Sequence, residues 1–371
     1  MQIPFIDLKS QYLAYQQEID QAIHQVIDQT SFINGKVITE LEEELAAYTQ
    51  AKHAICCSSG TDALILALMA IELRPGDEVI TTAFTFVATA EAIALLGGKP
   101  VFIDIEPDGC LMNPEKIAAA ITSRTRAVMP VSLFGQTADM DAIHGIAAQH
   151  QLTVIEDAAQ SFGASYKGRK SCALSPLACT SFFPAKPLGC YGDGGAVFTE
   201  QADLAEKCLQ LRNHGQSDQY NYQYIGINGR LDSIQAAVLR VKLQHFEQEV
   251  KQRRQVAQIY DQLLADAVQS GKIRVLKEAH YGKSVYAQYS LVTETREQRA
   301  SLMQQLHKAN VPVKIYYPNP LHQQQPYYSP IQLPVTEQLS QTIFSIPISP
   351  FISEAQQHYV VDSIIRCLKN C

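Results

Sequence analysis

Short apolar runs alternate with stretches of helical spacing through the first half of the chain. The runs are typical of buried strands and lie at residues 54–57, 78–82, 100–104, 127–131 and 153–156. Turn sequences such as Arg74-Pro-Gly-Asp77 separate them from the helical stretches. Because strands that alternate with helices form βαβ units, the pattern predicts an α/β domain with a large, mostly parallel sheet.

Two more strand patterns, at residues 178–182 and 195–199, flank a glycine-punctuated turn, and we expect them to pair with each other. Ahead of the strands, apolar residues recur at helical spacing between residues 8 and 29. They predict an N-terminal helix whose apolar face is more typical of core packing than of a partner surface. Residues 39–42, Thr-Glu-Leu-Glu, have the form of a capping box and predict the start of a second helix.

The second half of the chain is organised differently. Residues 232 to about 266 predict one long amphipathic helix. The elements predicted after it are a strand at 285–292, a helix from about 297, a proline-rich loop at 318–334 and a closing helix from about 353. Because 371 residues exceed the size at which one core keeps growing, we expect a large domain at 1–250 and a small α+β domain at 251–371.

Composition narrows the classes of function. A net charge of −7 and the lack of a basic run argue against a nucleic-acid partner, since phosphate backbones need a basic face. No apolar run reaches membrane length, and the N-terminal residues lack the pattern of a signal peptide. We therefore expect a soluble, cytoplasmic protein with no membrane partner.

The nine cysteines include no C-x-x-C spacing, so we expect neither a metal site nor a disulfide framework. We interpret them as small buried hydrophobes in a reducing compartment. Cys367 and Cys371, near the C-terminus, are expected to be the more exposed ones.

The stretch from Thr180 to Gly195 places Lys186 in a tight, apolar turn. An exposed lysine is a poor nucleophile at neutral pH, whereas a desolvated lysine, or one that forms an imine with an aldehyde cofactor, is reactive. Lys186 is therefore a candidate Schiff-base nucleophile. A solvated loop lysine is the alternative, and the turn by itself leaves it open.

A second candidate lies upstream, where an apolar strand pattern runs into Glu156, Asp157 and Gln160. Ligands of open α/β sheets bind at the carboxyl ends of strands. An aspartate there can keep a pyridine nitrogen protonated, which makes a pyridoxal ring an effective electron sink. A helix N-cap is the alternative for Asp157, but Asp157 and Lys186 together favour a pyridoxal site more strongly than either does alone.

A third candidate is the turn Ser-Ser-Gly-Thr at residues 58–61, between a short strand and a helix. Gly60 and Thr61 can bind a phosphate there, because the first turn of a helix has free N–H groups and the positive end of the dipole. The turn has no P-loop lysine and no G-x-G-x-x-G pattern, which disfavours a nucleotide. An ordinary capped turn is the alternative.

A fourth segment joins the loop at residues 212–216 to the tyrosine-rich residues 220–224. It is polar and aromatic, as a substrate lid is, and a solvated surface loop is the alternative.

These segments resemble the DegT/DnrJ/EryC1/StrS family of sugar-nucleotide aminotransferases. The resemblance runs essentially from end to end and is most specific at residues 60–63, 84–90, 156–161, 181–189 and 226–232. It implies the aspartate-aminotransferase fold of pyridoxal 5′-phosphate (PLP) enzymes, with pyridoxamine phosphate as the second form of the cofactor. The stretch around Lys186 looks most like enzymes that move an amino group from L-glutamate to C3 of a UDP-linked 3-keto sugar in bacterial O-antigen and lipopolysaccharide synthesis.

The resemblance also implies roles for single residues at the ring of the cofactor. Lys186 would form the Schiff base with PLP, and Asp157 would pair with the pyridine nitrogen. Gln160 would lie near the ring hydroxyl, and Phe86 would stack on the ring, as suits a flat, electron-poor system.

Phosphate binding falls, by the same resemblance, to Gly60, Thr61 and Ser181. Asn228 and Arg230 match a loop that crosses to the neighbouring subunit, where Asn228 would reach the phosphate and Arg230 the sugar nucleotide. A site completed in this way implies an obligatory homodimer.

One departure from the family bears on the sugar. Similar enzymes read His-Tyr-Pro where this chain reads Tyr316-Tyr317-Pro318, so Tyr316 replaces a histidine expected near the substrate. An imidazole can carry a positive charge toward a carboxylate, and a phenol cannot. Arg230 could still bind a carboxylate, or a diphosphate. The sugar stays open between a 3-oxo-glucuronate, a 3-oxo-N-acetylglucosamine and a different nucleotide-linked keto sugar.

Two rival classes are disfavoured. A PLP-dependent sugar dehydratase shares the fold, but the enzymes of that kind that resemble this chain have histidine at the position of Lys186. A PLP-binding regulator would need an added DNA-binding domain, for which we see no room in the sequence.

Overall fold

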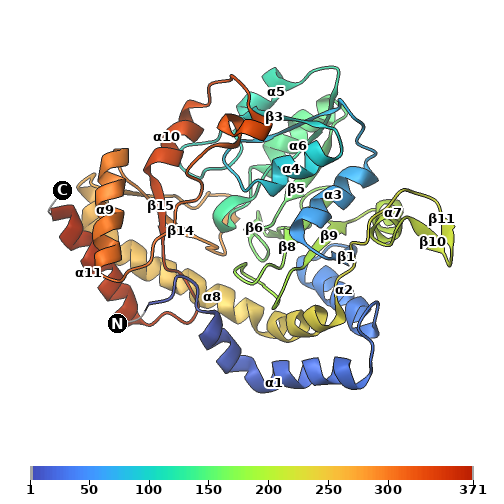
Figure 1. Cartoon of the computed structure of the whole chain (residues 1–371). Helices are drawn as coiled ribbons and strands as arrows, with labels where there is room; N and C mark the ends of the chain where they lie inside the picture. Colours follow the sequence, from blue (N-terminus) through green and yellow to red (C-terminus); the bar gives the residue numbers. More distant parts are fainter. Residues whose placement is uncertain (1–2, 370–371) are drawn as a thin grey trace.

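The computed structural model describes residues 3–369, and its largest sheet has seven strands in the order β1-β9-β8-β5-β4-β2-β3 (Figure 1). The strands are β1 (His53–Cys57), β2 (Glu78–Thr82), β3 (Lys99–Ile103), β4 (Thr125–Val128), β5 (Thr153–Asp157), β8 (Leu177–Ser181) and β9 (Gly195–Thr199). Neighbours from β3 to β8 pair in parallel, and β9 is antiparallel to both β8 and β1. The expected α/β fold with a mostly parallel sheet is confirmed.

Each of these strands overlaps its predicted range, and the expected pairing of the two strands around the lysine turn is also confirmed. In the β8–β9 ladder, Ser181 lies opposite Gly195. The turn that contains Lys186 therefore leaves the sheet at the end of β8 and returns at the start of β9.

Alternate side chains of the strands enter cores on opposite faces of the sheet. On β1, Ala54 and Cys56 enter one core and Ile55 and Cys57 the other. The first face is covered by α2 (Lys36–Thr49), α5 (Ile117–Ala120), α6 (Met140–Gln149) and the first half of α8 (Ser233–Gln269). The second face is covered by α3 (Gly60–Ala70), α4 (Ala88–Leu95) and α7 (Ala202–Arg212).

Helix α1 (Leu8–Asp28) runs alongside α8 (Figure 1). Ile19 of its apolar face is fully buried against Val238 and Val241 of α8, whereas Ile27 is 44% exposed. Most of the apolar stripe therefore packs within the same chain, as expected.

The predicted capping box is wrong, because α2 begins at Lys36 and Thr39 lies inside its first turns. The N-cap is Gly35, where the chain passes close to Ser31 and Ser233. A Cβ atom on Gly35 would lie 2.6 Å from the Ser31 hydroxyl, so this close passage decides where the helix starts.

Helix α8 joins two cores. Its first half packs in the sheet core through residues such as Leu239 and Val250, and its second half, from Val256, enters a separate core with Tyr260 and Leu264. That second core is built on β12 (Arg274–Val275), β14 (Tyr289–Val292), β15 (Ile343–Ile346), α9 (Arg296–Lys308) and α11 (Glu354–Lys369), beside α10 (Pro334–Thr342). The packing supports a domain boundary near residue 250, which stays a prediction.

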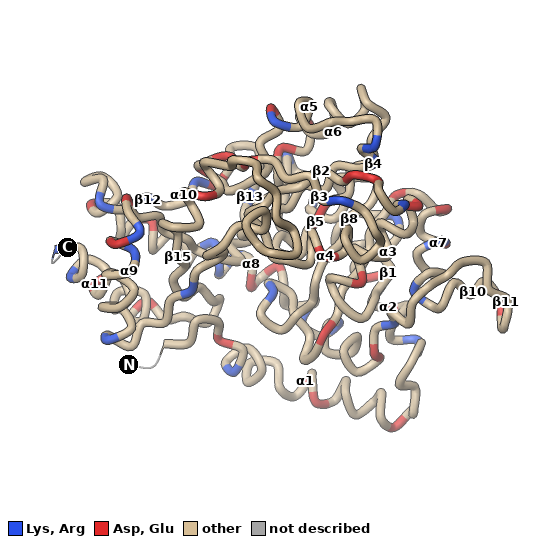
Figure 2. The backbone as a smooth tube through the Cα atoms, turned by 45° about the horizontal axis from the view of Figure 1, so that its top comes forward, with Lys and Arg blue, Asp and Glu red and all other residues tan. Residues whose placement is uncertain are grey.

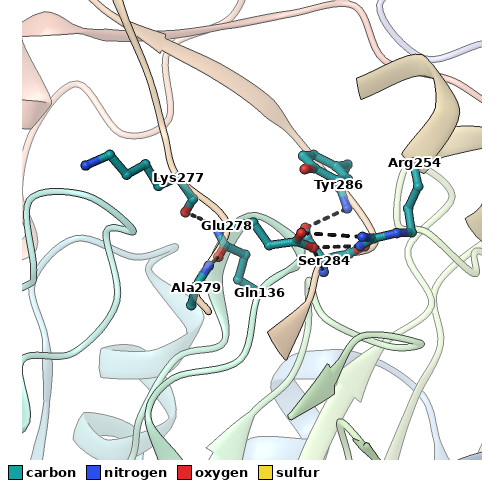
Figure 3. A network of polar contacts seen from close by, with 7 residues as sticks. All are labelled: Gln136, Arg254, Lys277, Glu278, Ala279, Ser284 and Tyr286. Atoms are coloured by element: carbon teal, nitrogen blue, oxygen red, sulfur yellow. Dashed lines mark hydrogen bonds and ion pairs between the residues drawn. The ribbon is translucent and has the colours of Figure 1, made fainter. Parts of the chain in front are cut away.

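Strand β14 begins at Tyr289 and is shorter than predicted, and the N–H of Val285 donates to the carbonyl of Gly135 at 2.9 Å instead of to a neighbouring strand. A polar network nearby joins the segment before β14 to Gln136 and Arg254 (Figure 3). Gln136 donates to the carbonyl of Lys277 at 3.1 Å and accepts from the N–H of Ala279 at 2.8 Å. Glu278 in turn pairs with Arg254 of α8 at 2.6 Å. This network connects the two cores close to the end of the sheet.

Two small sheets complete the fold. One joins β6 (Ser165–Tyr166), β7 (Arg169–Lys170) and β13 (Gly282–Lys283), and the other is a hairpin of β10 (Gln216–Asp218) and β11 (Asn221–Tyr222). The hairpin projects from the edge of the molecule (Figure 1).

The cysteines in residues 3–369 are all buried. The expected exposure of Cys367 is wrong: it is 6% exposed, because α11 turns it into the second core. Cys371 lies outside the described residues. Basic and acidic residues are interspersed along the backbone (Figure 2). Within the described part of the chain, none of the helices combines the length and the apolar character needed to span a bilayer.

Candidate functional site

Asp157 is the last residue of β5, at the carboxyl end of the central parallel strands, and it is 4% exposed. Thr89 at the start of α4 donates its hydroxyl to Oδ2 at 2.7 Å, and the N–H of Ala159 donates to Oδ1 at 3.2 Å. Burial raises the pKa of Asp157, and these hydrogen bonds and the charge of Lys186 oppose that rise. The carboxylate is thus held in place, with acceptor capacity left for a ligand.

Glu156 precedes Asp157 and points to the other face of the sheet. It is fully buried and accepts from the hydroxyls of Ser132 at 2.7 Å and Ser171 at 2.8 Å and from the N–H of Cys172 at 3.0 Å. Its oxygens are therefore engaged inside the protein, so the two adjacent acids have different tasks.

Lys186 is half-buried in the turn between β8 and β9, and its N–H donates to the carbonyl of Phe183 at 2.8 Å. Desolvation lowers the pKa of Lys186, while the charge of Asp157 acts in the opposite direction. The two groups interact electrostatically, so the fold brings together two residues that the sequence separates. A lysine of lowered pKa is the more reactive kind.

The start of α3 lies next to the same turn. Gly60 packs so closely on Ser181 that a Cβ atom would lie 2.6 Å from the Cβ of Ser181. Ser59 caps the helix, accepting from the N–H of Asp62 at 3.0 Å. The N–H groups of Gly60 and Thr61 precede the first intrahelical bond, so this turn offers donors to an anion.

Gln160 links the site to Phe134 and Tyr317, which pack in the same apolar cluster. Its Oε1 accepts from the N–H of Phe134 at 2.9 Å, and its Nε2 donates to the hydroxyl of Tyr317 at 2.9 Å. Burial, together with the charge of Asp157, raises the pKa of Tyr317, so it is a neutral phenol at physiological pH. Phe86 is 55% exposed, and its ring centre lies 6.5 Å from that of Tyr317.

The remaining predicted residues lie at the border of this cluster. Gly229, between Asn228 and Arg230, accepts through its carbonyl from the N–H of Ser58 at 2.9 Å, in the turn before α3. Asn228 itself is exposed, and Arg230 donates to Asn213 at 2.7 Å. Tyr316 is half-buried, with its ring centre 6.4 Å from that of Phe5 and 5.7 Å from that of Tyr317.

The suspected lid divides into two parts. Arg212 pairs with Glu42 at 2.6 Å and also donates to the carbonyl of Cys56, so it holds the fold together. The following hairpin exposes Tyr220 (79%) and Tyr222 (58%).

Sequence reasoning missed Thr89 and Phe134 as supports of the site. Thr89 lies in the 84–90 motif, but nothing in the sequence indicates that its hydroxyl reaches Asp157. Phe134 has a positive φ of 56°, and its N–H donates to Gln160. This contact depends on the tertiary fold and has no signal in the sequence.

Comparisons with known proteins agree with this geometry. The chain is 48% identical, over 95% of its length and 97% of the relative's, to a UDP-2-acetamido-2-deoxy-3-oxo-D-glucuronate aminotransferase from Pseudomonas aeruginosa. It is 40% identical, over 99% of its length and 98% of the relative's, to a UDP-N-acetyl-3-dehydro-alpha-D-glucosamine 3-aminotransferase from Acidithiobacillus ferrooxidans.

A solved structure described as NtdA from Bacillus subtilis, with bound cofactor pyridoxamine phosphate, superposes with a TM-score of 0.92. It is 30% identical and covers 99% of this chain and 85% of its own. The model of the DegT/DnrJ/EryC1/StrS aminotransferase family matches residues 14–365. The chain therefore belongs to the DegT/DnrJ/EryC1/StrS aminotransferase family, and it is a PLP-dependent aminotransferase.

Proposed function

We propose that this protein transfers the amino group of L-glutamate to C3 of a UDP-linked 3-keto sugar, with UDP-2-acetamido-2-deoxy-3-oxo-D-glucuronate as the sugar substrate. The observation that carries the chemistry is a buried Asp157 at the end of β5 within electrostatic reach of Lys186, beside the start of α3 at Gly60 and Ser181. The relative from P. aeruginosa, at 48% identity, supports the choice of sugar. The product suits bacterial O-antigen and lipopolysaccharide synthesis in the cytoplasm.

The residues present fit PLP. The close contact of Gly60 with Ser181 leaves backbone donors and a hydroxyl at one point, which suits the phosphate. Asp157 would hold the proton of the pyridine nitrogen, and Phe86 would cover the ring. When bound, PLP supplies an aldehyde for the amino group and an electron sink for the carbanion.

The protein contributes proton transfer and orientation. Desolvation helps Lys186 to reach its neutral form, in which Nζ can act as a nucleophile and accept a proton from the α-carbon of glutamate. The same Nζ can return a proton to the sugar in the second half of the ping-pong cycle. Gln160 and Tyr317, already bonded to each other, orient donors near the ring hydroxyl.

Arg230 would bind the nucleotide sugar, with Tyr316 and Tyr317 near the sugar ring. The alternative substrate is UDP-3-oxo-N-acetylglucosamine, supported by the relative from A. ferrooxidans. Tyr316 favours it, because a phenol offers no positive charge to a C6 carboxylate.

We also propose that the active form is a homodimer. The exposure of Asn228 supports this proposal, as does Arg230, which donates to Asn213 and has its side chain at the border of the lysine cluster of its own chain. Both would serve a site formed with a second copy. The half-exposed Phe86 leaves the cofactor side open to such a partner.

The test starts from the purified holoenzyme. Borohydride reduction followed by peptide mass spectrometry should place the pyridoxyl mass on Lys186, and L-glutamate should remove the visible absorbance band of the cofactor. The amino form of the enzyme is then given each 3-keto sugar, and the band should return faster with the glucuronate. Faster return with the N-acetylglucosamine derivative would select the alternative, and an unlabelled Lys186 would refute the proposal.

A further inference from the structure

A second lysine is buried close to the first. Lys242 of α8 is 2% exposed, and its Nζ donates to the carbonyl of Gly189, three residues after Lys186. The same Nζ lies 4.9 Å from the ring centre of Tyr191. Burying an ammonium group is unfavourable unless the group is paired, so this placement needs a reason.

Gly189 is packed directly on the turn that contains Lys186. A Cβ atom on Gly189 would lie 2.6 Å from the carbonyl oxygen of Pro184 and 2.7 Å from that of Phe183. The carbonyl of Phe183 also accepts the N–H of Lys186. A displacement of Gly189 therefore displaces the backbone that sets the direction of the Lys186 side chain.

Gln235 holds the same segment from the same helix. It lies seven residues, about two turns, before Lys242, so both side chains are on one face of α8. Its Oε1 accepts from the N–H of Tyr191 at 2.8 Å. Two side chains of a rigid helix thus hold residues 189–191 from one side.

The surroundings of Lys242 disfavour the charged form of its ammonium group. Desolvation lowers its pKa to about 8, and Arg253 adds to this, while Glu249 opposes it. Glu249 itself accepts two hydrogen bonds from Gln11 of α1, at 2.9 and 2.8 Å. A side chain that only filled this space would be apolar. The buried ammonium group therefore indicates that Lys242 holds the backbone at Gly189 in position.

We propose that Lys242, assisted by Gln235, is a positioning residue. It fixes the turn that contains Lys186 so that Lys186 can react with PLP. This inference rests on the proposed role of Lys186 as the nucleophile. Neither residue is proposed to touch the substrate.

The test uses the variant Lys242→Met, with Lys251→Met as the matched control, because Lys251 is an exposed lysine of the same helix. Apoenzyme is mixed with PLP, and samples are quenched with borohydride to follow the labelling of Lys186 over time. We expect labelling in Lys242→Met to be about tenfold slower, since a small misplacement of a reacting group has effects of this size. The control should label at the wild-type rate.

Steady-state kinetics and melting temperature separate positioning from general stability. For positioning, kcat falls while KM for both substrates stays within about twofold, at a temperature where the variant is fully folded. Gln235→Leu, on a half-buried residue, should show the same pattern with about a threefold loss, and it decides the question if Lys242→Met does not fold.

Wild-type labelling rates in the folded variants would overturn the inference while leaving the proposed function intact. Failure of wild-type enzyme to label at Lys186 would refute the proposed function instead.

Discussion

The cofactor side and the substrate side of this site are built differently. Asp157 ends β5, Lys186 lies in the turn between β8 and β9, and Gly60 begins α3. The contacts of these residues are made within one chain. Arg230, expected to bind the sugar nucleotide, and Asn228, expected to reach the phosphate, lie instead on a loop that contacts the turn before α3 through Gly229 and Ser58. The difference indicates that packed elements hold the groups proposed for the chemistry, while the residues proposed to bind the sugar nucleotide lie on loops.

The physical reason lies in rigidity. Groups that transfer protons must be held within fractions of an ångström, which packed strands achieve and loops do not. Exposed loops carry specificity because they can vary without disturbing the core.

Lys186→Ala should have the largest effect. Activity should fall by about 10³-fold or more, because both the nucleophile and the proton carrier are lost. The visible band of the cofactor should disappear as well. Turnover assays and spectra check this, and retention of wild-type turnover would remove Lys186 from the mechanism.

Asp157→Asn should lower kcat by about 10²-fold, because an amide cannot hold the proton of the pyridine nitrogen. Glu156→Gln is the control from the adjacent position. It should instead destabilise the fold by about 2 kcal/mol, since a buried amide NH₂ would face the donors that now bond Glu156. Equal loss of kcat in both variants would contradict the division of tasks.

Tyr316→His probes the substrate side. A protonated imidazole near C6 should raise kcat/KM for the glucuronate, relative to the N-acetylglucosamine substrate, by about tenfold. Competition between the two 3-keto sugars measures the ratio. An unchanged ratio would place residue 316 outside the sugar subsite.

Mixed dimers test whether the substrate side comes from a second chain. Lys186→Ala and Arg230→Ala should each be nearly inactive alone. If the site crosses a two-fold interface, random mixing should restore about a quarter of the wild-type sites, because half of the dimers then hold one intact site. Absence of restored activity after verified subunit exchange would argue for a site within one chain.

The smallest effect concerns pH. The pKa of Lys186 is lowered by desolvation, so the unfolded chain binds more protons than the folded apoenzyme between the lowered and the ordinary lysine pKa. This group's contribution to stability therefore grows as pH rises through that window. Denaturant unfolding of wild-type apoenzyme should show a steeper rise across it than Lys186→Met, and identical slopes would contradict the lowered pKa.

The sequence by itself determined the α/β class and the seven strands of the sheet, and it predicted Lys186 and Asp157 as site residues. Period-two and helical spacings report burial directly, and a lysine in an apolar turn or an acid after a buried strand stands out against its neighbours. The turn at residues 58–61 predicted Gly60, and the family motifs added Ser181, which the fold places against Gly60.

Tertiary structure alone decided the rest. The bond from Thr89 to Asp157, the start of α2 at a close passage by Gly35 and the burial of Cys367 all depend on segments distant in sequence. The hydrogen bond from Lys242 to the carbonyl of Gly189 joins residues that are 53 positions apart in the chain. Such contacts leave no local pattern, because each arises only when packing brings two independently formed elements together.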